Sequence, residues 1–363
     1  MPGLKKSKPT VLVGMSGGVD SSVSAALLQR RGFNVVGGFI KNWSDSKDVW
    51  TGECNWSGER RDALRVAAKL GIPLLTFDFE KEYRALVMKD FFRTYKKGET
   101  PNPDILCNQY IKFGLFFKMA KRLKMDYIAT GHYARVRWDS NGTAHLLRGA
   151  DTDKDQSYFL CRISQEALNR TFFPIGNLKK TAVRKLAKQF ALPVADKPDS
   201  QGICFVGKLD LKDFLRTKIK SKPGEIVDPK GRIIGRHDGL DRYTIGQRHG
   251  FAASGGTSAW YVARKDLRKN CLIVVPGARH PWLYSDSAVV RDVHWLGVRP
   301  PAFPIKVQVQ IRYRQKPVSA IVASDKYKNR VKLKFTEPVK AAAAGQSAVF
   351  YKGQECLGGG FLC

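Results

Sequence analysis

In the first third of the chain, two patterns of apolar and polar residues follow each other in turn. Short apolar runs, typical of buried strands, are separated by longer segments with one apolar helical face. The predicted strands are Val11–Met15, Val35–Ile40, Pro73–Phe79 and Tyr127–Thr130, and the predicted helices are Ser22–Arg31, Arg60–Leu70, Lys81–Arg93 and Lys112–Leu123. This alternation predicts an α/β domain with a Rossmann-like parallel sheet and right-handed crossovers. Ligands of such sheets bind at the carboxyl ends of the strands.

Two irregular stretches interrupt this pattern. In Gly98–Asn108, the segment Thr100–Asp104 is predicted to be neither helix nor central strand, because each proline removes a donor and restricts the preceding residue. The second stretch is Asp196–Gly202. A short helix, Leu211–Ile219, then leads into glycine-rich, strand-like sequence that ends near residue 281.

The last segment, Ser285–Cys363, has an all-β pattern. In Ile305–Arg314, apolar residues at every second position alternate with Lys, Gln and Arg, which predicts one strand with a core face and a basic face. Further strands are predicted at Val331–Phe335 and Ser347–Tyr351. A small β-barrel or sandwich is therefore expected at this end of the chain.

Length and composition are those of a globular protein. With 363 residues the chain has room for two or three domains. Hydrophobic residues make up 43% of it, but no apolar run is long enough to span a membrane. The segment Met1–Thr10 is lysine-rich and lacks the apolar core of a secretory signal. We expect a cytoplasmic protein.

The charge is strongly positive. The chain has 63 Lys and Arg against 32 Asp and Glu, a formal net charge of +31, and the basic residues are spread along its length. This favours a broad surface for a polyanion such as a nucleic acid. A generally basic proteome of the source organism would explain the same excess, so charge alone indicates a partner and not a reaction.

Seven cysteines, at positions 54, 107, 161, 204, 271, 356 and 363, form no CxxC pair. Their odd number and spacing disfavour a structural zinc site and a secreted disulfide framework. Most are expected to be small buried hydrophobic residues. Cys107 and Cys204 are different, because Cys107 lies at the end of the first irregular stretch and Cys204 just after the second, where exposure would allow a thiolate to react.

The segment Ser16–Ser22, SGGVDSS, follows the first predicted strand and precedes the first predicted helix. Backbone N–H groups of such a glycine-rich loop, next to a helix N-terminus, can hold phosphate. A simple turn is the alternative. The lysine that ends a Walker-A loop is missing, which disfavours ordinary γ-phosphate transfer. The segment instead resembles the loop of ATP pyrophosphatases, which cleave ATP between the α and β phosphates.

A series of motifs then extends this resemblance over residues 10–361. They are SGGVDSS, TPNPDILCN, ATGHYARV, DKDQSYFL, DSQGICF, TIGQRHG, RYRQ and GQSAVFY followed by CLGGG. In this order they resemble the tRNA-specific 2-thiouridylases. The resemblance implies an ATP pyrophosphatase domain (1–206), a small central domain (207–284) and a C-terminal β-barrel (285–363). It also implies synthesis of 2-thiouridine at the wobble uridine of tRNA from ATP and a persulfide.

The resemblance assigns roles to individual residues. Cys204 would carry the persulfide, Cys107 would be the second catalytic cysteine, and Asp104 would share the catalytic set. A Cys107–Cys204 disulfide would remain after each turnover. ATP would contact Gly14, Met15, Ser16, Gly17, Gly18, Val19, Asp20, Ser21, Ile40 and Gly131, with Mg²⁺ near Asp20. The target base and tRNA would contact Asn102, Pro103, Asp104, Lys154, Asp155, Gln156, Arg312 and Tyr313.

Several of these assignments have a simpler alternative. Asn102–Asp104 is also a good turn, Gly131 a turn glycine and Arg312 part of a solvated strand face, while Ile40 stands where many relatives have methionine. The expected partners are tRNAs for Lys, Glu and Gln and a sulfur-relay protein or cysteine desulfurase. Competing functions are an amide synthetase, argininosuccinate synthase, a 4-thiouridine or lysidine enzyme, and a non-catalytic RNA-binding protein.

Overall fold

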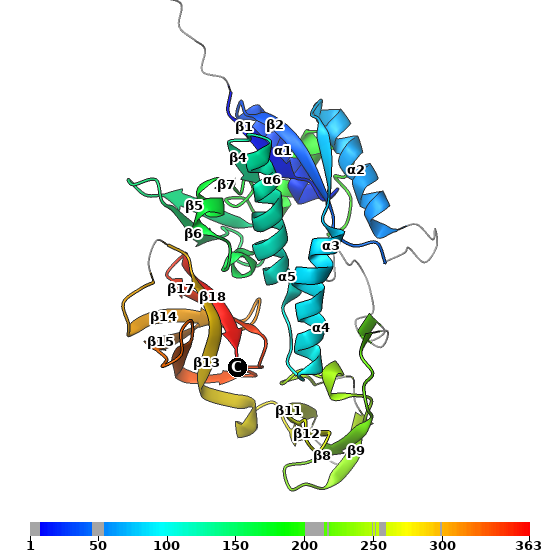
Figure 1. Cartoon of the computed structure of the whole chain (residues 1–363), viewed down its shortest axis with the longest axis vertical. Helices are drawn as coiled ribbons and strands as arrows, with labels where there is room; N and C mark the ends of the chain where they lie inside the picture. Colours follow the sequence, from blue (N-terminus) through cyan, green and yellow to red (C-terminus); the bar gives the residue numbers. More distant parts are fainter. Residues whose placement is uncertain are drawn as a thin grey trace, which may run out of the picture.

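The computed structural model of the chain describes residues 8–45, 54–199, 214, 215, 218–248, 250, 252, 253, 259–297 and 300–363. Three regions follow one another along its long axis (Figure 1). The N-terminal α/β region lies at one end, the C-terminal barrel lies beside its helices, and a small central sheet forms the other end.

The N-terminal sheet is parallel throughout, as predicted. Its strands, in spatial order, are β3 (Leu74–Asp78), β2 (Asn34–Lys41), β1 (Thr10–Gly14), β4 (Tyr127–Ala129) and β7 (Thr171–Phe172). The four predicted strands are all present, with ends that differ by at most one residue. The chain adds β2 and β3 on one side of β1 and β4 on the other, so the order reverses between β1 and β4. Such a switch point opens a crevice at the carboxyl ends of the two strands.

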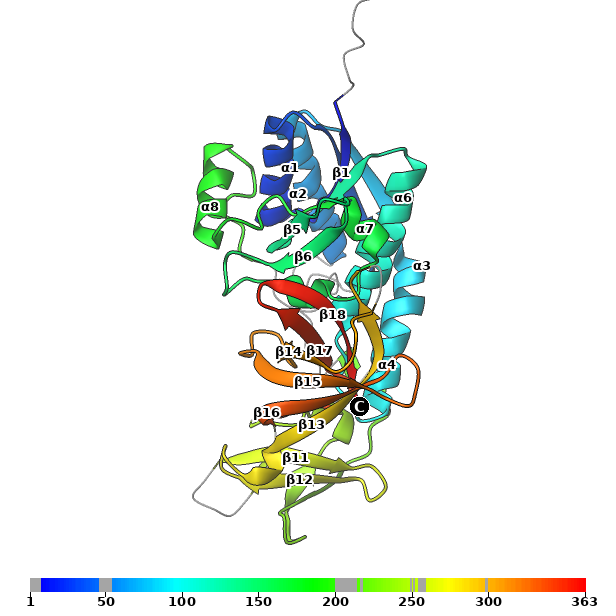
Figure 2. The same cartoon turned by 90° about the vertical axis from the view of Figure 1, so that its left-hand side faces the viewer.

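Helices cover both faces of this sheet (Figure 2). On one face lie α1 (Val19–Arg30), α2 (Asn55–Leu70) and α8 (Lys180–Gln189), and on the other lie η2 (Cys107–Leu115) and α6 (Phe116–Arg122). The period of two along β1 explains this arrangement. Val11 and Val13 pack in the cluster of the first face, whereas Leu12 packs in the cluster of the second.

One long helical segment connects the N-terminal region to the central sheet. It consists of α3 (Glu80–Tyr83), η1 (Arg84–Met88) and α4 (Lys89–Lys96). At its end, Lys265 Nζ donates a hydrogen bond to the Gly98 carbonyl over 2.7 Å. Burial lowers the pKa of Lys265 to about 8, against the opposing effect of Asp241.

The prediction that the proline-rich segment contains no helix is wrong. A helix, α5 (Pro103–Leu106), begins inside it and continues into η2. Pro103 occupies a first-turn position, where its missing N–H is not needed, and Asn102 Oδ1 caps the helix by accepting from the Ile105 N–H over 3.4 Å. Cys107 is therefore helical, and its side chain is buried with 0% exposure, contrary to the exposed loop position expected for it.

The C-terminal segment is a closed barrel. Its strands are β13 (Tyr284–Trp295), β14 (Ile305–Gln310), β15 (Val318–Ser324), β16 (Val331–Lys340), β17 (Ser347–Lys352) and β18 (Glu355–Leu362). Pairing of β13 with both β16 and β18 closes it. The hairpin of β5 (Ala134–Trp138) and β6 (Ala144–Arg148) extends this sheet from the N-terminal region, through β18.

The predicted basic strand is shorter than expected. Residues 306–309 alternate between exposed and buried as predicted, but β14 ends at Gln310. Tyr313 instead turns toward the N-terminal region and packs against Phe159, with ring centroids 4.4 Å apart and the ring planes tilted by 50°. Arg314 adopts a left-handed backbone with φ of +63°. A single basic strand face that includes Arg314 is therefore not formed.

The central sheet contains β8 (Gly224–Val227), β9 (Ile233–His237), β10 (Ala252–Ala253), β11 (Trp260–Asp266) and β12 (Cys271–Pro276). Shorter helices connect the larger elements: η3 (Ser157–Leu160), α7 (Gln165–Asn169), η4 (Leu240–Arg242) and η5 (Pro281–Leu283). The predicted helix at 211–219 lies partly outside the described residues, and residues 214, 215 and 218 are helical.

Candidate active site

The loop between β1 and α1 has the geometry of an anion cradle. Gly17 has φ of +71°, and a Cβ there would lie 2.2 Å from the Glu59 carbonyl oxygen, so only glycine fits. Helix α1 begins after Gly18, which supplies no side-chain cap. The first backbone N–H groups of a helix have no partner within it. They are therefore available to phosphate oxygens.

Hydroxyl groups hold this loop in shape. Ser21 Oγ accepts from the Ser16 N–H over 3.2 Å and donates to the Gly18 carbonyl over 3.2 Å. Ser22 Oγ donates to the same carbonyl over 2.7 Å. Met15 N–H donates to the Gly38 carbonyl of β2 over 2.9 Å, which fixes the loop to the sheet. The repeated serines of the motif thus preorganise the cradle.

Gly131 brings the end of β4 against this loop. A Cβ at Gly131 would lie 2.6 Å from the Ser21 backbone nitrogen and 2.7 Å from the Asp20 carbonyl carbon. Real side chains are not found at such distances from backbone atoms, so this close approach requires glycine. The loop after β1 and the turn after β4 therefore meet at the switch point of the sheet.

A cavity of about 550 Å³ opens at this point. Its lining includes most residues expected to contact ATP: Gly14, Met15, Ser16, Gly18, Val19, Asp20, Ser21, Ile40 and Gly131. From the expected catalytic and tRNA-contacting sets it includes Asp104, Lys154, Gln156 and Tyr313. Residues from the α/β region and the barrel thus share one cavity.

The remaining predicted residues lie elsewhere. Pro103 is buried, and Asn102 lines a second cleft on the other side of α5. The Asp155 carboxylate is held inside the protein by Arg148 Nη1 at 3.0 Å and by the Gly149 and Ser157 N–H groups. Arg312 is exposed. Burial raises the pKa of Tyr158, and the nearby charge of Arg312 opposes this increase.

The structure describes only one of the two cysteines of the predicted pair. Cys107 is fully buried at the start of η2, and Cys204 lies outside the described residues. No disulfide joins the cysteines within the described ranges. Burial raises the pKa of the Cys161 thiol to about 12 and that of Cys356 well above its usual value, so both are inert.

Lys180 is the most informative residue that sequence reasoning missed. It lies at the start of α8, lines the cavity and places Nζ 2.8 Å from both Asp20 carboxylate oxygens. The same Nζ lies 2.8 Å from Asp199 Oδ1. Tyr133 donates its hydroxyl to Asp20 Oδ1 over 2.9 Å. The cavity thus contains a lysine from α8, although the phosphate loop itself has none.

Asp199 is the centre of the surrounding ion pairs. Lys154 Nζ lies 2.9 Å and Arg184 Nη2 2.7 Å from its carboxylate. Burial raises the pKa of Asp199, but hydrogen bonds from Lys180 and Lys154 outweigh this effect and hold the pKa at about 2. Asp199 therefore stays ionised and orients two lysines that line the cavity.

A weak sequence signal for Lys180 exists. Lys179 and Lys180 stand at the cap and first position of α8, and no acidic residue is present in its first turn. Cations are unfavourable at a helix N-terminus because of the helix dipole. Two consecutive lysines there indicate a role other than helix stability.

His132 and Glu59 complete the polar lining. Burial, assisted by Lys112, lowers the pKa of His132 well below its usual value, and Thr130 Oγ1 lies 2.7 Å from its Nδ1. His132 is therefore neutral at pH 7. Burial raises the pKa of Glu59, with Lys197 opposing and Asp62 adding to the effect. Within the described ranges, no three His, Cys, Asp or Glu side chains gather as a metal site.

Three family models match the chain in order along its length. A tRNA methyl transferase HUP domain matches residues 9–208, a tRNA methyl transferase PRC-barrel domain matches 212–276, and an aminomethyltransferase β-barrel domain matches 285–362. The chain is thus a three-domain protein of the HUP class. Of the helices that the structure describes, none is long and apolar enough to cross a membrane.

Similarity to curated proteins extends over nearly the whole length. The chain is 45% identical over 352 residues to the tRNA-specific 2-thiouridylase MnmA of Geobacillus thermodenitrificans, covering 97% of this chain and 94% of that protein. The values are the same for MnmA 2 of Geobacillus kaustophilus. The chain therefore belongs to the tRNA-specific 2-thiouridylase family and is an enzyme of the tRNA sulfurtransferase class. This membership decides against the competing functions considered above.

Two solved structures are similar to part of the chain. NMN synthetase from Francisella tularensis is 21% identical, with a TM-score of 0.36, over 54% of this chain and 67% of that one. A 4-thiouridine synthetase in complex with RNA and ATP is 15% identical, with a TM-score of 0.36, over 58% of this chain and 50% of that one.

Proposed function

We propose that the enzyme converts the wobble uridine of tRNA to 2-thiouridine in two steps. The uridine O2 first attacks the α-phosphorus of ATP, and pyrophosphate leaves. A persulfide sulfur then attacks C2, and AMP leaves with the original oxygen. Adenylation is needed because the carbonyl oxygen of uridine is otherwise a poor leaving group. The acceptors would be tRNAs for Lys, Glu and Gln.

One observation carries this proposal. The phosphate loop, Gly131 and Asp104 line one cavity together with Lys154 and Tyr313. A nucleoside triphosphate held by the loop would therefore have its α-phosphate beside a surface formed by both the α/β region and the barrel. A base taken out of its stack could reach that surface and be recognised there by hydrogen bonds and ring contacts.

Lys180 would take the role of the missing loop lysine. Without nucleotide its ammonium group neutralises Asp20. Asp20 would be a ligand for Mg²⁺, and Lys180 would then be able to donate its hydrogen bonds to phosphate oxygens of ATP. Mg²⁺ commonly binds through one or two carboxylates together with substrate phosphates. It would neutralise the charge of the departing pyrophosphate.

Sulfur transfer would use Cys204 and Cys107. The outer sulfur of a Cys204 persulfide would form the bond to C2, and the Cys107 thiolate would attack the inner sulfur and break the S–S bond. The product is a Cys107–Cys204 disulfide, which a two-electron reductant must open before the next cycle. A sulfur-relay protein or cysteine desulfurase would supply the persulfide. Because Cys107 has no exposed surface, this step requires the groups that cover it to move when RNA binds.

The direct test is product formation. The purified enzyme is incubated with ATP, Mg²⁺, a persulfide donor and unmodified tRNA for Lys, and the digested tRNA is analysed by mass spectrometry. We expect 2-thiouridine in the anticodon only when all components are present. Thiolation without ATP, or at a position outside the anticodon, would contradict the proposal.

A further inference from the structure

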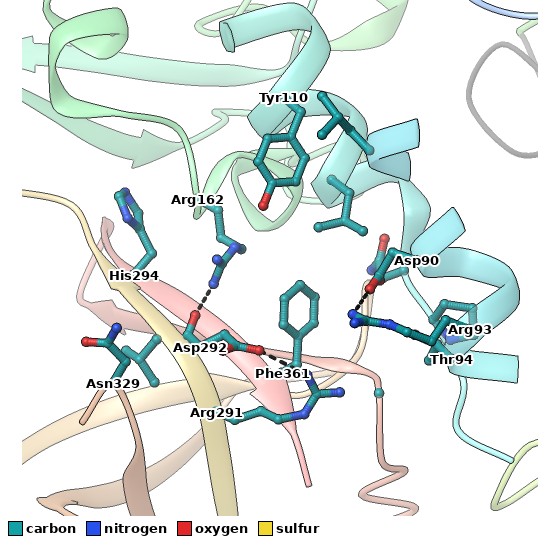
Figure 3. Close-up of a pocket in the computed structure, with 16 residues that line it drawn as sticks. Asp90, Arg93, Thr94, Tyr110, Arg162, Arg291, Asp292, His294, Asn329 and Phe361 are labelled. Carbon is teal, nitrogen blue, oxygen red and sulfur yellow. Dashed lines mark hydrogen bonds and ion pairs between the residues drawn. The ribbon is translucent and has the colours of Figure 1, made fainter. Parts of the chain in front are cut away.

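A second cavity, of about 450 Å³, lies between the α/β region and the barrel (Figure 3). Its volume falls in the usual range of sites for small molecules, about 300–1,000 Å³. Helix α4, the start of η2 and the segment after η3 contribute to one wall, and β13 and β18 contribute to the other. The predicted site residues do not explain this cavity, because Asn102 alone among them lines it.

Aromatic rings and guanidinium groups are among the side chains that line it. The Phe361 ring stands in the middle of the cleft, and the Tyr110 hydroxyl points toward it (Figure 3). Arg162 Cζ lies 5.0 Å from the centroid of the Phe361 ring, and Arg291 Cζ lies 5.8 Å from it. Arg93 lines the outer part of the same cavity, paired with Asp90.

The guanidinium groups are held in place by the protein. Arg162 Nε donates to Gln109 Oε1 over 2.8 Å, and its Nη1 donates to the Asp292 carbonyl. Arg291 is paired with Glu99 Oε2 at 3.0 Å and with Asp292 Oδ2 at 3.0 Å. Their planes are therefore oriented before any ligand arrives, which lowers the ordering cost of binding.

A break in strand β13 creates the barrel wall of this cleft. The pairing of β13 with β18 shifts register between Arg291 and His294, and Asp292 has a left-handed backbone with φ of +52°. Arg291, Asp292, Val293 and His294 all line the cleft as a result. An uninterrupted strand would turn every second of these side chains into the barrel.

Helix α5 separates the two cavities. Asp104 lines the cavity at the phosphate loop, whereas Asn102 and Leu106 line the second cleft. The two cavities are therefore separated by the width of one helix, about 10 Å with side chains. A ligand of the second cleft would therefore lie within a short reach of whatever base occupies the first.

From these features we infer that the second cleft binds one unpaired nucleotide of the RNA substrate, a neighbour of the target uridine in the same loop. Aromatic rings and guanidinium planes are the groups on which unstacked bases bind in RNA complexes. Arg93 and Arg291 are each paired with carboxylates, whereas Arg162 donates to uncharged oxygens of Gln109 and Asp292. The positive charge of Arg162 therefore suits a single phosphate and not a polyanion. This inference rests on the proposed function, since it needs RNA as the substrate.

Photo-crosslinking tests the inference directly. A set of anticodon stem-loop RNAs is prepared, each with 5-iodouridine at one loop position other than the target, and irradiated in complex with the full-length enzyme. Peptide mapping should show a crosslink to Phe361 or Tyr110 from at least one position. No crosslink to either ring, from an RNA that the enzyme thiolates normally, overturns the inference while the proposed function stands.

Two variants and one free ligand complete the test. Phe361→Leu, which keeps apolar bulk, should raise the KM for the stem-loop about tenfold and leave the KM for ATP unchanged, since stacking on a ring is worth about 1–3 kcal/mol per base. Trp282→Leu, an exposed ring outside both cavities, should change neither. An unchanged KM in Phe361→Leu, or crosslinking by free 5-iodouridine monophosphate and not by RNA, contradicts an RNA-binding role.

Discussion

Replacing Lys180 by alanine is the sharpest perturbation of the proposed chemistry. The ammonium group makes contacts of 2.8 Å with both oxygens of Asp20 and with Asp199. Without it, Asp20 keeps the Tyr133 hydroxyl, and Asp199 keeps Lys154 and Arg184. Because these partners remain and Asp20 is partly solvated, we expect a loss of only about 1–2 kcal/mol in the free energy of unfolding.

The effect on the reaction should be larger. A cation that contacts the phosphates stabilises charge developing in the transition state. Removing one such preorganised group typically costs about 10²–10³ in rate. We therefore expect AMP formation by Lys180→Ala to fall by that factor, measured in single turnover with substrate tRNA and saturating ATP. Lys180→Arg should recover part of the rate, because it keeps the charge but not the compact shape.

Arg184→Met is the matched control for this perturbation. Arg184 also pairs with Asp199 and donates to the Ala195 and Lys197 carbonyls, but it does not line the cavity. Its loss should lower the free energy of unfolding by a similar amount and leave AMP formation within about threefold of the wild type. If Lys180→Ala reacts as fast as Arg184→Met, Lys180 has only a structural role and does not contact the phosphates in the transition state.

Three further predictions concern other parts of the molecule. Gly131→Ala should abolish ATP binding in calorimetry because its Cβ would meet the phosphate-loop backbone, whereas Gly58→Ala, with nothing within 4 Å, should bind normally. Cys107→Ser and Cys204→Ser should each abolish 2-thiouridine formation, measured by mass spectrometry, with unchanged circular dichroism. The hydrogen bond to Glu355, and a weaker one to Asp139, raise the pKa of His145 in the folded protein. Protonated His145 therefore stabilises the fold fully below about pH 6.5, the pKa of an unperturbed histidine, and this stabilisation is lost as the pH rises through the raised pKa. The Tm difference between wild type and His145→Gln should therefore be larger at pH 6 than at pH 9, and a constant difference would contradict this.

Local periodicity predicted the first sheet well because β1, β2 and β4 are mostly buried apolar runs separated by helical segments. The spatial order of the strands depends on contacts between residues far apart in the sequence, so local patterns do not predict it. That Gly14 and Gly131 lie at the carboxyl ends of their strands, on the same edge of the sheet, follows from the predicted parallel arrangement alone. The proline-rich segment was predicted wrongly for a local reason. A proline at the first position of a helix needs no N–H, and the preceding Asn102 caps it.

Other parts of the site could not be found by local patterns. Lys180 reaches Asp20 across 160 positions of sequence, so only the tertiary fold brings the pair together. The position of Tyr313 depends on where β14 ends, and the alternation of Ile305–Arg314 gives no sign of that end. The second cleft depends on a register shift in β13 at Asp292, a residue with no marked sequence signal.

The central claim, that the enzyme activates uridine by adenylation, is tested most directly by the nucleotide products. ATP labelled separately on the α and γ phosphates is incubated with enzyme, Mg²⁺, substrate tRNA and a persulfide donor, and products are separated over one turnover. We expect one AMP and one pyrophosphate for each 2-thiouridine formed. ADP and orthophosphate as the main products, or AMP released in equal amount without tRNA, would contradict it.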